Sequence, residues 1–245
     1  MEYFHISYTS GIPFLYSIIN RLNALKEPRR RELGTWGPKM GDAALALSTK
    51  IHTVQIAVLR LEKDISDLDA EISARAELVD KCISVKPPRA LMLQNDEIGF
   101  RLIASLDAFL YEARSEYEML RTFVLRFTRD ILKKRCNETE AERILEQAML
   151  NAGHRSDWVE DLRRNRATFF HQTAPWFAMQ ITNRDPRKYE LLILSENVAD
   201  LEKSPSYVKF EKYRQIWLGL GNCATSLQRW TFAKFDEVDP TLKVP

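Results

Sequence analysis

The chain has 245 residues, of which 45% are hydrophobic and 29% charged, and its 36 basic and 34 acidic residues leave a formal net charge of +2. This near balance excludes a strongly basic coat for nucleic acids, although it is compatible with a local basic patch. With 8 Gly and 10 Pro, the sequence is poor in the turn residues that sheet proteins need, which favours long helices.

The three cysteines are too few and too far apart for a disulfide scaffold, and they indicate a reducing compartment. None lies at metal-ligand spacing from another Cys or His, so we expect no metal and no cofactor. The first nine residues lack the pattern of a signal peptide, and no stretch approaches the roughly 20 apolar residues of a membrane span. The sequence therefore predicts a cytoplasmic protein without a membrane partner.

In chain order, residues 14–25 are predicted as a short amphipathic helix and the basic run at 26–31 as a solvated loop. The clearest periodicity follows, with apolar residues alternating by three and four at Ile51, Val54, Val58, Leu61, Ile65, Leu68 and Ile72. This heptad pattern predicts one long helix over about residues 38–85. Such a helix would exceed roughly 60 Å, so it bends, breaks, or forms an arm of a helical hairpin over about residues 38–86.

A second long helix is predicted over about residues 96–134, packed antiparallel to the first and ending in a basic last turn. A cap at residues 137–140 begins a helix that runs to about residue 150. The next helix runs from about 157 to 173, where Pro175 limits it. Residues 176–181 and 189–194 predict either a small β-hairpin or a helix tail and a loop. A last helix spans about residues 205–235.

Together these elements predict an all-α protein, an up-and-down helical bundle with a long helical hairpin arm, with one small β-hairpin as the only sheet. The composition does not change sharply anywhere along the chain. We therefore expect a single domain over residues 1–245, with a core at about 95–235 and the arm at about 38–86.

The helix at about 157–173 carries the residues that suit chemistry. Residues seven apart on a helix are almost eclipsed, so Arg164 and His171 lie on one face. That stripe also holds Asp157, Asp161 and Thr168, and the opposite side holds Trp158, Leu162 and Phe169. Such a stripe is also what the ordinary solvated face of an amphipathic helix looks like.

An arginine and a histidine on one face suit work on a phosphodiester. Arg164 can grip two phosphate oxygens, and His171 can take or give a proton near neutral pH. Asn165 adds an amide that can hold a ligand or orient the imidazole. Arg166 is only five residues from the histidine, about 140° around a straight helix, and is the poorer partner. The alternative is that a histidine beside Phe170 is simply packed and hydrogen-bonded.

The pair Arg164-Asn165, followed by His171 in a helical chain, resembles the signature of the HEPN superfamily (higher eukaryotes and prokaryotes nucleotide-binding). Six residues separate Arg164 from His171, and four separate Arg166 from His171. Residues 105–112 also resemble the family's helix that packs beside the motif. The resemblance covers about residues 95–235 and leaves the arm unexplained.

This resemblance implies a helical homodimer with two motif copies at one cleft. Active members are metal-independent endoribonucleases, often toxins of toxin–antitoxin pairs or defence effectors, whereas others serve as binding or assembly modules. It implies Arg164 and His171 as catalytic residues, with Asn165, Arg166 and Thr168 binding RNA phosphate or supporting them. A subgroup that accepts nucleotides has a Tyr two positions after the His, where this chain has Thr173. The alternative function is a non-catalytic helical dimer that binds a protein partner through residues 38–86.

Overall fold

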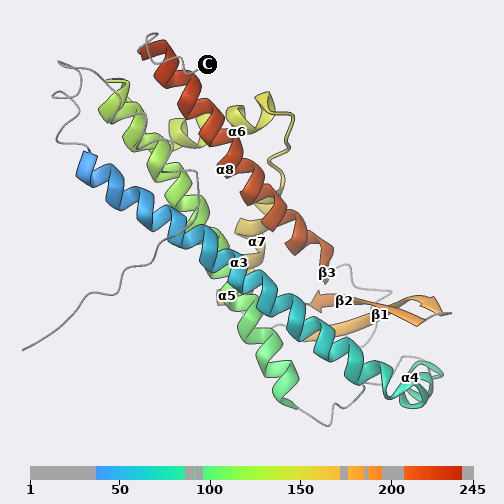
Figure 1. Cartoon of the computed structure of the whole chain (residues 1–245). Helices are drawn as coiled ribbons and strands as arrows, with labels where there is room; N and C mark the ends of the chain where they lie inside the picture. The colour runs from blue at the N-terminus through green and yellow to red at the C-terminus, as the bar shows by residue number, and fades with distance from the viewer. Residues whose placement is uncertain are drawn as a thin grey trace, which may run out of the picture. The chain divides into compact units, whose positions relative to one another are not determined.

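A computed structural model describes residues 37–85, 91, 96–171, 176–184, 187–194 and 207–238. This part of the chain is mostly helical, as the sequence predicts, and contains one small antiparallel sheet (Figure 1). Its elements are α3 (Gly37–Ser73), α4 (Ala76–Ile83), α5 (Asp96–Arg126), the π-helical segment η1 (Phe127–Ile131), α6 (Glu138–Asn151), α7 (Trp158–His171), β1 (Trp176–Arg184), β2 (Arg187–Leu194), β3 (Tyr207–Lys209) and α8 (Glu211–Val238). The helix expected at 14–25 lies outside the described residues. No helix in the described part is long and apolar enough to pass through a lipid bilayer.

The chain divides into two compact units. Unit 1 takes its residues from Met1–Thr53, Ser115–Ser156 and Leu220–Pro245, and unit 2 takes its residues from Val54–Arg114 and Asp157–Gly219. Consequently α6 belongs to unit 1, α7 and the sheet belong to unit 2, and α3, α5 and α8 contribute residues to both.

An aromatic cluster around Phe127 forms the centre of unit 1. The Phe127 ring stacks on Phe123 at 5.9 Å between centroids, and it meets the edges of Trp230 at 5.5 Å and Phe235 at 5.2 Å. Phe127 itself is fully buried. Aromatic pairs at such distances stabilise a core beyond the area that they bury, so this cluster joins the end of α5 to α8 within the unit.

The second long helix ends earlier than the sequence predicts. α5 passes at Phe127 into η1, where Leu132 N donates to Phe127 O at 3.2 Å, and the chain then leaves the helix at Lys133, whose φ is 53°. The wider π turn and the left-handed residue stop the helix. The basic residues 133–135 therefore follow the helix end and do not form its last turn, which corrects the prediction of a helix to residue 134.

The predicted cap of α6 is confirmed. The Asn137 side chain accepts a hydrogen bond from Glu140 N, and the Glu140 carboxylate accepts one from Asn137 N, both at 2.9 Å. This reciprocal pair satisfies two of the donors that the first turn of a helix leaves free. The helix ends at Asn151, and Gly153 follows with a φ of 78° that favours glycine.

In unit 2 the heptad face of α3 is largely buried, and its polar neighbours show how α3 lies on α5. Asp64 accepts a hydrogen bond from Ser105 at 2.6 Å, and Asp67 accepts one from Arg101 at 2.7 Å. Contacts run backward along α5 as they run forward along α3, so the two helices are antiparallel here, as predicted. The predicted arm packs on its own chain in this unit.

The first long helix is interrupted rather than continuous to residue 85. α3 ends at Ser73 and α4 begins at Ala76, with Arg75 between them at φ −119° and ψ 32°. The interruption shifts the phase, so that Val79 is the buried residue of α4. The phase shift in the apolar pattern at Ala76 is the signal in the sequence for this break.

The β-hairpin prediction is confirmed, and a third strand extends it. β1 pairs with β2 from Trp176↔Leu194 to Arg184↔Arg187, with an irregularity between Ile181 and Asn183. β2 also pairs with β3, so that β2 is the central strand and its residues 191–194 are all buried. The last helix therefore begins at Glu211 and not near residue 205, because residues 207–209 pair with β2.

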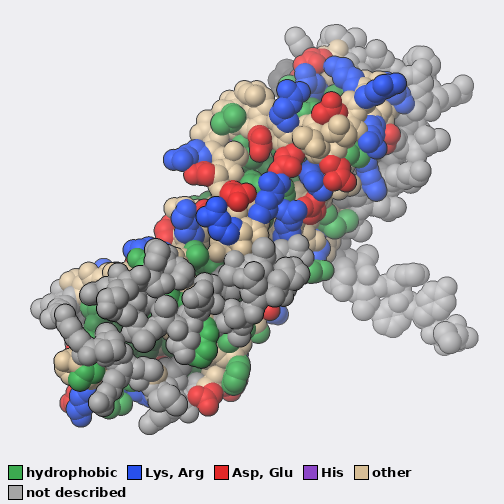
Figure 2. All heavy atoms as spheres, turned by 180° about the vertical axis from the view of Figure 1, so that it is seen from behind, with side chains coloured by type: hydrophobic (Ala, Val, Ile, Leu, Met, Phe, Trp, Pro, Cys, Tyr) green, Lys and Arg blue, Asp and Glu red, His purple; other side chains and the backbone are tan. Residues whose placement is uncertain are grey.

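Acidic and basic side chains alternate over the described surface that Figure 2 shows, and neither sign forms a broad field there. This distribution agrees with the small net charge of +2. Any attraction for a polyanion must therefore come from a local group of cations.

Candidate functional site

Helix α7 is fixed in unit 2 by one apolar face. Trp158, Val159 and Leu162 are buried on it. A Cβ placed on Gly219 of α8 would lie 2.4 Å from Trp158 Cγ, so only glycine allows the indole to pack there. The buried face thus determines which residues of α7 point outward.

Arg164 points outward. Its side chain is 70% exposed, and it forms an ion pair with Glu160, one turn earlier, at 3.7 Å. An ion pair this long and this exposed contributes little to stability, so a phosphate could displace the carboxylate at small cost. The spacing of four residues between Glu160 and Arg164 is the sequence signal for this pair.

Asn165 lies on the buried face, with a relative exposure of 6%. Its Nδ2 donates to the Asp161 carbonyl at 2.8 Å, one turn back along the same helix. The structure therefore separates Asn165 from Arg164, its neighbour in the motif. Asn165 therefore bonds to the backbone of its own helix, a role that differs from holding a ligand on the exposed stripe.

Arg166, Thr168 and His171 all belong to α7, which continues without a break to His171. Their side chains lie outside the described residues. The backbone alone sets their positions: residues 164 and 171 are seven apart on one continuous helix, and residue 168 lies between them on the same stripe.

Lys212 of α8 joins the candidate site through Asp161. Its Nζ lies 2.9 Å from Asp161 Oδ2, although 51 residues separate the two in the chain. Tyr213 lies next to Lys212, and burial, with the Asp161 charge second, raises the pKa of the Tyr213 hydroxyl. No local sequence pattern predicts these contacts, because they depend on how α7 and α8 pack.

Asp107 and Glu112 are the acidic residues of the segment 105–112, which resembles the family's helix beside the motif. Asp107 is partly buried, and this burial raises the pKa of its carboxyl. Glu112 is also partly exposed. The described structure records no hydrogen bond from Asp107 to α7.

The charges along α7 follow the helix dipole. Glu160 and Asp161 lie in its first turn, and Arg163, Arg164 and Arg166 follow toward its carboxyl end. Such an order stabilises a helix by itself, because it opposes the partial charges of the two ends. It also places the cations between the acidic first turn and His171. Among the residues that the structure describes, no three His, Cys, Asp or Glu side chains gather where they could hold a metal ion.

No family model matches this chain, and no curated protein or solved structure matches it either.

Proposed function

We propose that the chain is a metal-independent endoribonuclease of HEPN type, in which Arg164 and His171 of α7 act on an RNA phosphodiester. One observation carries the proposal: α7 is a single helix from Trp158 to His171, so that the two residues share a stripe on which the Arg164 side chain is 70% exposed. Two turns of helix rise about 11 Å, which a guanidinium and an imidazole can span around one bound phosphate group.

The reaction needs one proton carrier and one fixed cation. His171 removes the proton of the ribose 2′-hydroxyl or protonates the leaving 5′-oxygen, as the 2′-oxygen forms a bond to phosphorus and the bond to the 5′-oxygen breaks. The products are a 2′,3′-cyclic phosphate and a 5′-hydroxyl. Arg164 stabilises the negative charge that develops on the phosphate oxygens. Thr168, on the same stripe, binds the neighbouring phosphate, and Arg166 supports RNA binding from another side of the helix.

The proposed enzyme is a homodimer. The helices form an up-and-down bundle, and two chains pair so that two copies of the motif share one cleft, as the HEPN resemblance implies. Such an enzyme would act on cytoplasmic RNA as a toxin or a defence effector. Trp176, five residues after His171 and 49% exposed, offers a surface on which a base can stack.

The test is RNA cleavage in excess EDTA by the wild type and by His171→Ala and Arg164→Ala. Loss of the proton carrier is expected to lower the rate about 10²–10⁴-fold, and loss of the cation by a similar factor. The chain supplies matched controls in His154→Ala and Arg155→Ala, which remove the same side chains from the loop before α7 and should cleave as the wild type does. Equal cleavage by the wild type and His171→Ala would refute the site.

The second candidate is a non-catalytic helical dimer. Ile56 and Leu59, one turn apart on α3, are 49% and 58% exposed and so form an exposed apolar pair. In this alternative a second copy of the chain covers them. Sedimentation velocity tests it: Ile56→Lys with Leu59→Lys should give a monomer, whereas Thr139→Lys, at an exposed position of α6, should leave the dimer intact. A dimer that resists the double change excludes this surface.

A further inference from the structure

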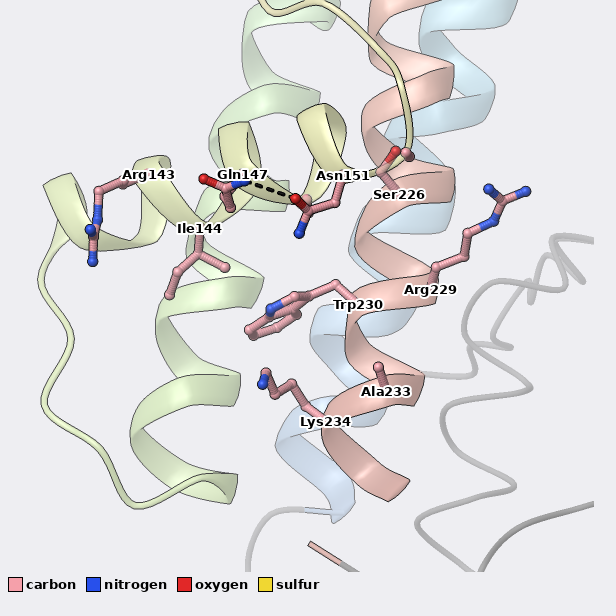
Figure 3. A pocket seen from close by; sticks show the side chains of 11 residues that line it. Arg143, Ile144, Gln147, Asn151, Ser226, Arg229, Trp230, Ala233 and Lys234 are labelled. Atoms are coloured by element: carbon pink, nitrogen blue, oxygen red, sulfur yellow. Dashed lines mark hydrogen bonds between the residues drawn. The ribbon is translucent and has the colours of Figure 1, made fainter. Parts of the chain in front are cut away.

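Unit 1 contains a groove of about 570 Å³ between α6 and α8 (Figure 3). This volume is within the range of sites for small molecules. Its polar and aromatic lining consists of Arg143, Gln147, Asn151, Ser226, Arg229, Trp230 and Lys234. None of these residues belongs to α7.

The groove is locally basic in a chain of nearly balanced charge. Three of its described lining residues are cationic, and no described lining residue is acidic. Arg143 comes from α6 and Lys234 from α8, so that each wall carries a cation. Figure 3 shows Lys234 beside the Trp230 indole, and the Arg143 and Arg229 side chains directed away from it. Lys234 also pairs with Glu237, which is not a lining residue. An anion beside the indole would meet Lys234 directly and Arg143 after rotation of its long side chain.

Two amides give the groove a defined polar edge. Gln147 Nε2 donates to Asn151 Oδ1 at 2.8 Å, as Figure 3 shows. With that bond made, the Gln147 oxygen can accept a hydrogen bond and the Asn151 amide can donate one. A ring with a donor and an acceptor on one edge complements this pair.

Trp230 supplies an aromatic surface. Its indole extends from α8 into the space beside α6 (Figure 3), and Phe127 supports it with ring centroids at 5.5 Å and an interplanar angle of 64°. Because Phe127 is fully buried, the indole is held in position before any ligand arrives. A held indole favours a planar ring, since stacking needs no further ordering.

An unpaired hydroxyl points independently to a ligand. Ser226 lines the groove, is 2% exposed, and its Oγ has no hydrogen-bond partner among the residues that the structure describes. Buried hydroxyls are almost always paired, so each exception calls for an explanation. A polar ligand atom in the groove would satisfy Ser226 after rotation about its Cα–Cβ bond.

We infer that the α6–α8 groove binds a small heteroaromatic anion: its ring lies on Trp230, its anionic group lies between Arg143 and Lys234, and its polar edge meets Gln147 and Asn151. Two sources share this chemistry, a nucleoside monophosphate and a heteroaromatic carboxylate. This site is separate from the proposed RNA-cleaving residues and uses a different helix.

The test is calorimetric titration of the full chain with adenosine monophosphate and, separately, with 6-aminonicotinate, whose amino group and ring nitrogen form a donor–acceptor edge away from its carboxylate. Either probe should bind, and for the nucleotide, adenosine or inorganic phosphate alone should bind at least tenfold more weakly. Arg143→Gln and Lys234→Gln should each weaken the binding by about tenfold, the effect of one charge-assisted hydrogen bond. Arg135→Gln, an exposed residue of the same unit outside the lining, should change nothing.

Absence of binding by both probes at millimolar concentration would overturn the inference. So would equal weakening by Arg143→Gln, Lys234→Gln and Arg135→Gln, which would indicate diffuse attraction to charge.

Two further variants address the ring and the hydroxyl. Trp230→Phe keeps an aromatic contact with Phe127 and should bind the probes several-fold more weakly. Its circular dichroism spectrum should match that of the wild type, which shows that the variant folds. Ser226→Ala removes an unpaired group, so the chain should fold, and affinity should again fall. Unchanged affinity in both folded variants would contradict the proposed pose. His171→Ala should bind the probe normally, whether or not the wild type cleaves RNA, which separates the two proposals.

Discussion

Gly219 of α8 lies directly against the indole of Trp158 at the start of α7, with 2.4 Å between Trp158 Cγ and the place where a Cβ would stand. Contacts this short do not occur for a real Cβ, and the obstacle is the inner part of a buried indole ring. The contact therefore sets how closely the two helices approach in unit 2. It also fixes the helix that carries Arg164.

Gly219→Ala is expected to destabilise the chain by about 1–3 kcal/mol, because the added methyl group must displace the indole. Gly221→Ala is the matched control on the same helix, since nothing lies within 4 Å of its Cβ position. That change should stabilise the helix by about 0.5–1 kcal/mol, because alanine is the better helix former. Urea denaturation of both variants measures the difference. Equal stability of the two variants would show that Trp158 can move.

Glu160→Gln is expected to strengthen RNA binding and leave the fold unchanged. It removes the carboxylate 3.7 Å from Arg164 and a negative charge that repels phosphate, and both side chains are mostly exposed. The expected gain in affinity is about twofold to fivefold at low salt and smaller at high salt. Fluorescence anisotropy with a labelled single-stranded RNA measures it, with Glu146→Gln on α6 as the control. A gain equal to that of the control would mean that Arg164 does not contact RNA.

The buried carboxyl of Glu116 should make the free energy of unfolding depend on pH. Its side chain is 3% exposed, and burial raises the pKa of its carboxyl from 4.5 to about 7. Between these values the folded chain binds the proton and the unfolded chain does not, so stability decreases as pH rises from about 4.5 to about 7. Below and above this window Glu116 adds no pH dependence. The full change is about 3 kcal/mol at most.

Glu116→Gln should remove this part of the pH dependence and be more stable than the wild type at pH 8. Urea denaturation between pH 4 and pH 8 measures both effects. Glu118→Gln, on the same helix but only half-buried, should keep the slope of the wild type. A slope that survives in Glu116→Gln would assign it to other groups.

The three cysteines should differ in their reactivity. Cys136 and Cys223 are buried, and burial raises the pKa of both thiols, to about 12 for Cys223. Cys82 of α4 is only partly buried. Since the thiolate is the reactive form, a disulfide reagent at pH 8 should modify one thiol rapidly and all three only after unfolding. Cys82→Ser should abolish the rapid phase. Rapid modification of Cys223 would mean that unit 1 opens readily.

Patterns that recur along the chain predict most of the described elements. The heptad of α3, the cap at Asn137 and the apolar strands that flank residues 183–186 each record a local physical preference, and the structure follows all three. The third strand was missed because Tyr207–Lys209 is short and is stabilised by pairing with β2, a contact that no window of sequence contains. The π turn at Phe127 likewise depends on packing rather than on local preference.

The candidate site divides in the same way. Helical spacing places residues 164 and 171 on one stripe of α7, but it does not reveal which face of the helix is buried. The position of Asn165 next to Arg164 in the sequence predicts a residue that holds a ligand. In the structure its amide donates to the Asp161 carbonyl and its side chain is buried. The sequence does not predict a role for Lys212, because its partner Asp161 lies 51 residues away along the chain.

The different directions of Arg164, which is exposed, and Asn165, which is buried, limit how α7 can change in length. Neighbouring residues on a helix differ by about 100° in direction, so one inserted residue between Trp158 and Asn165 would turn every later side chain by that angle. The inserted chain would then have to bury a guanidinium or withdraw Asn165 from the interior. An inserted residue is therefore expected to be tolerated in the connection at residues 152–157. There it does not turn the side chains of α7 about the helix axis.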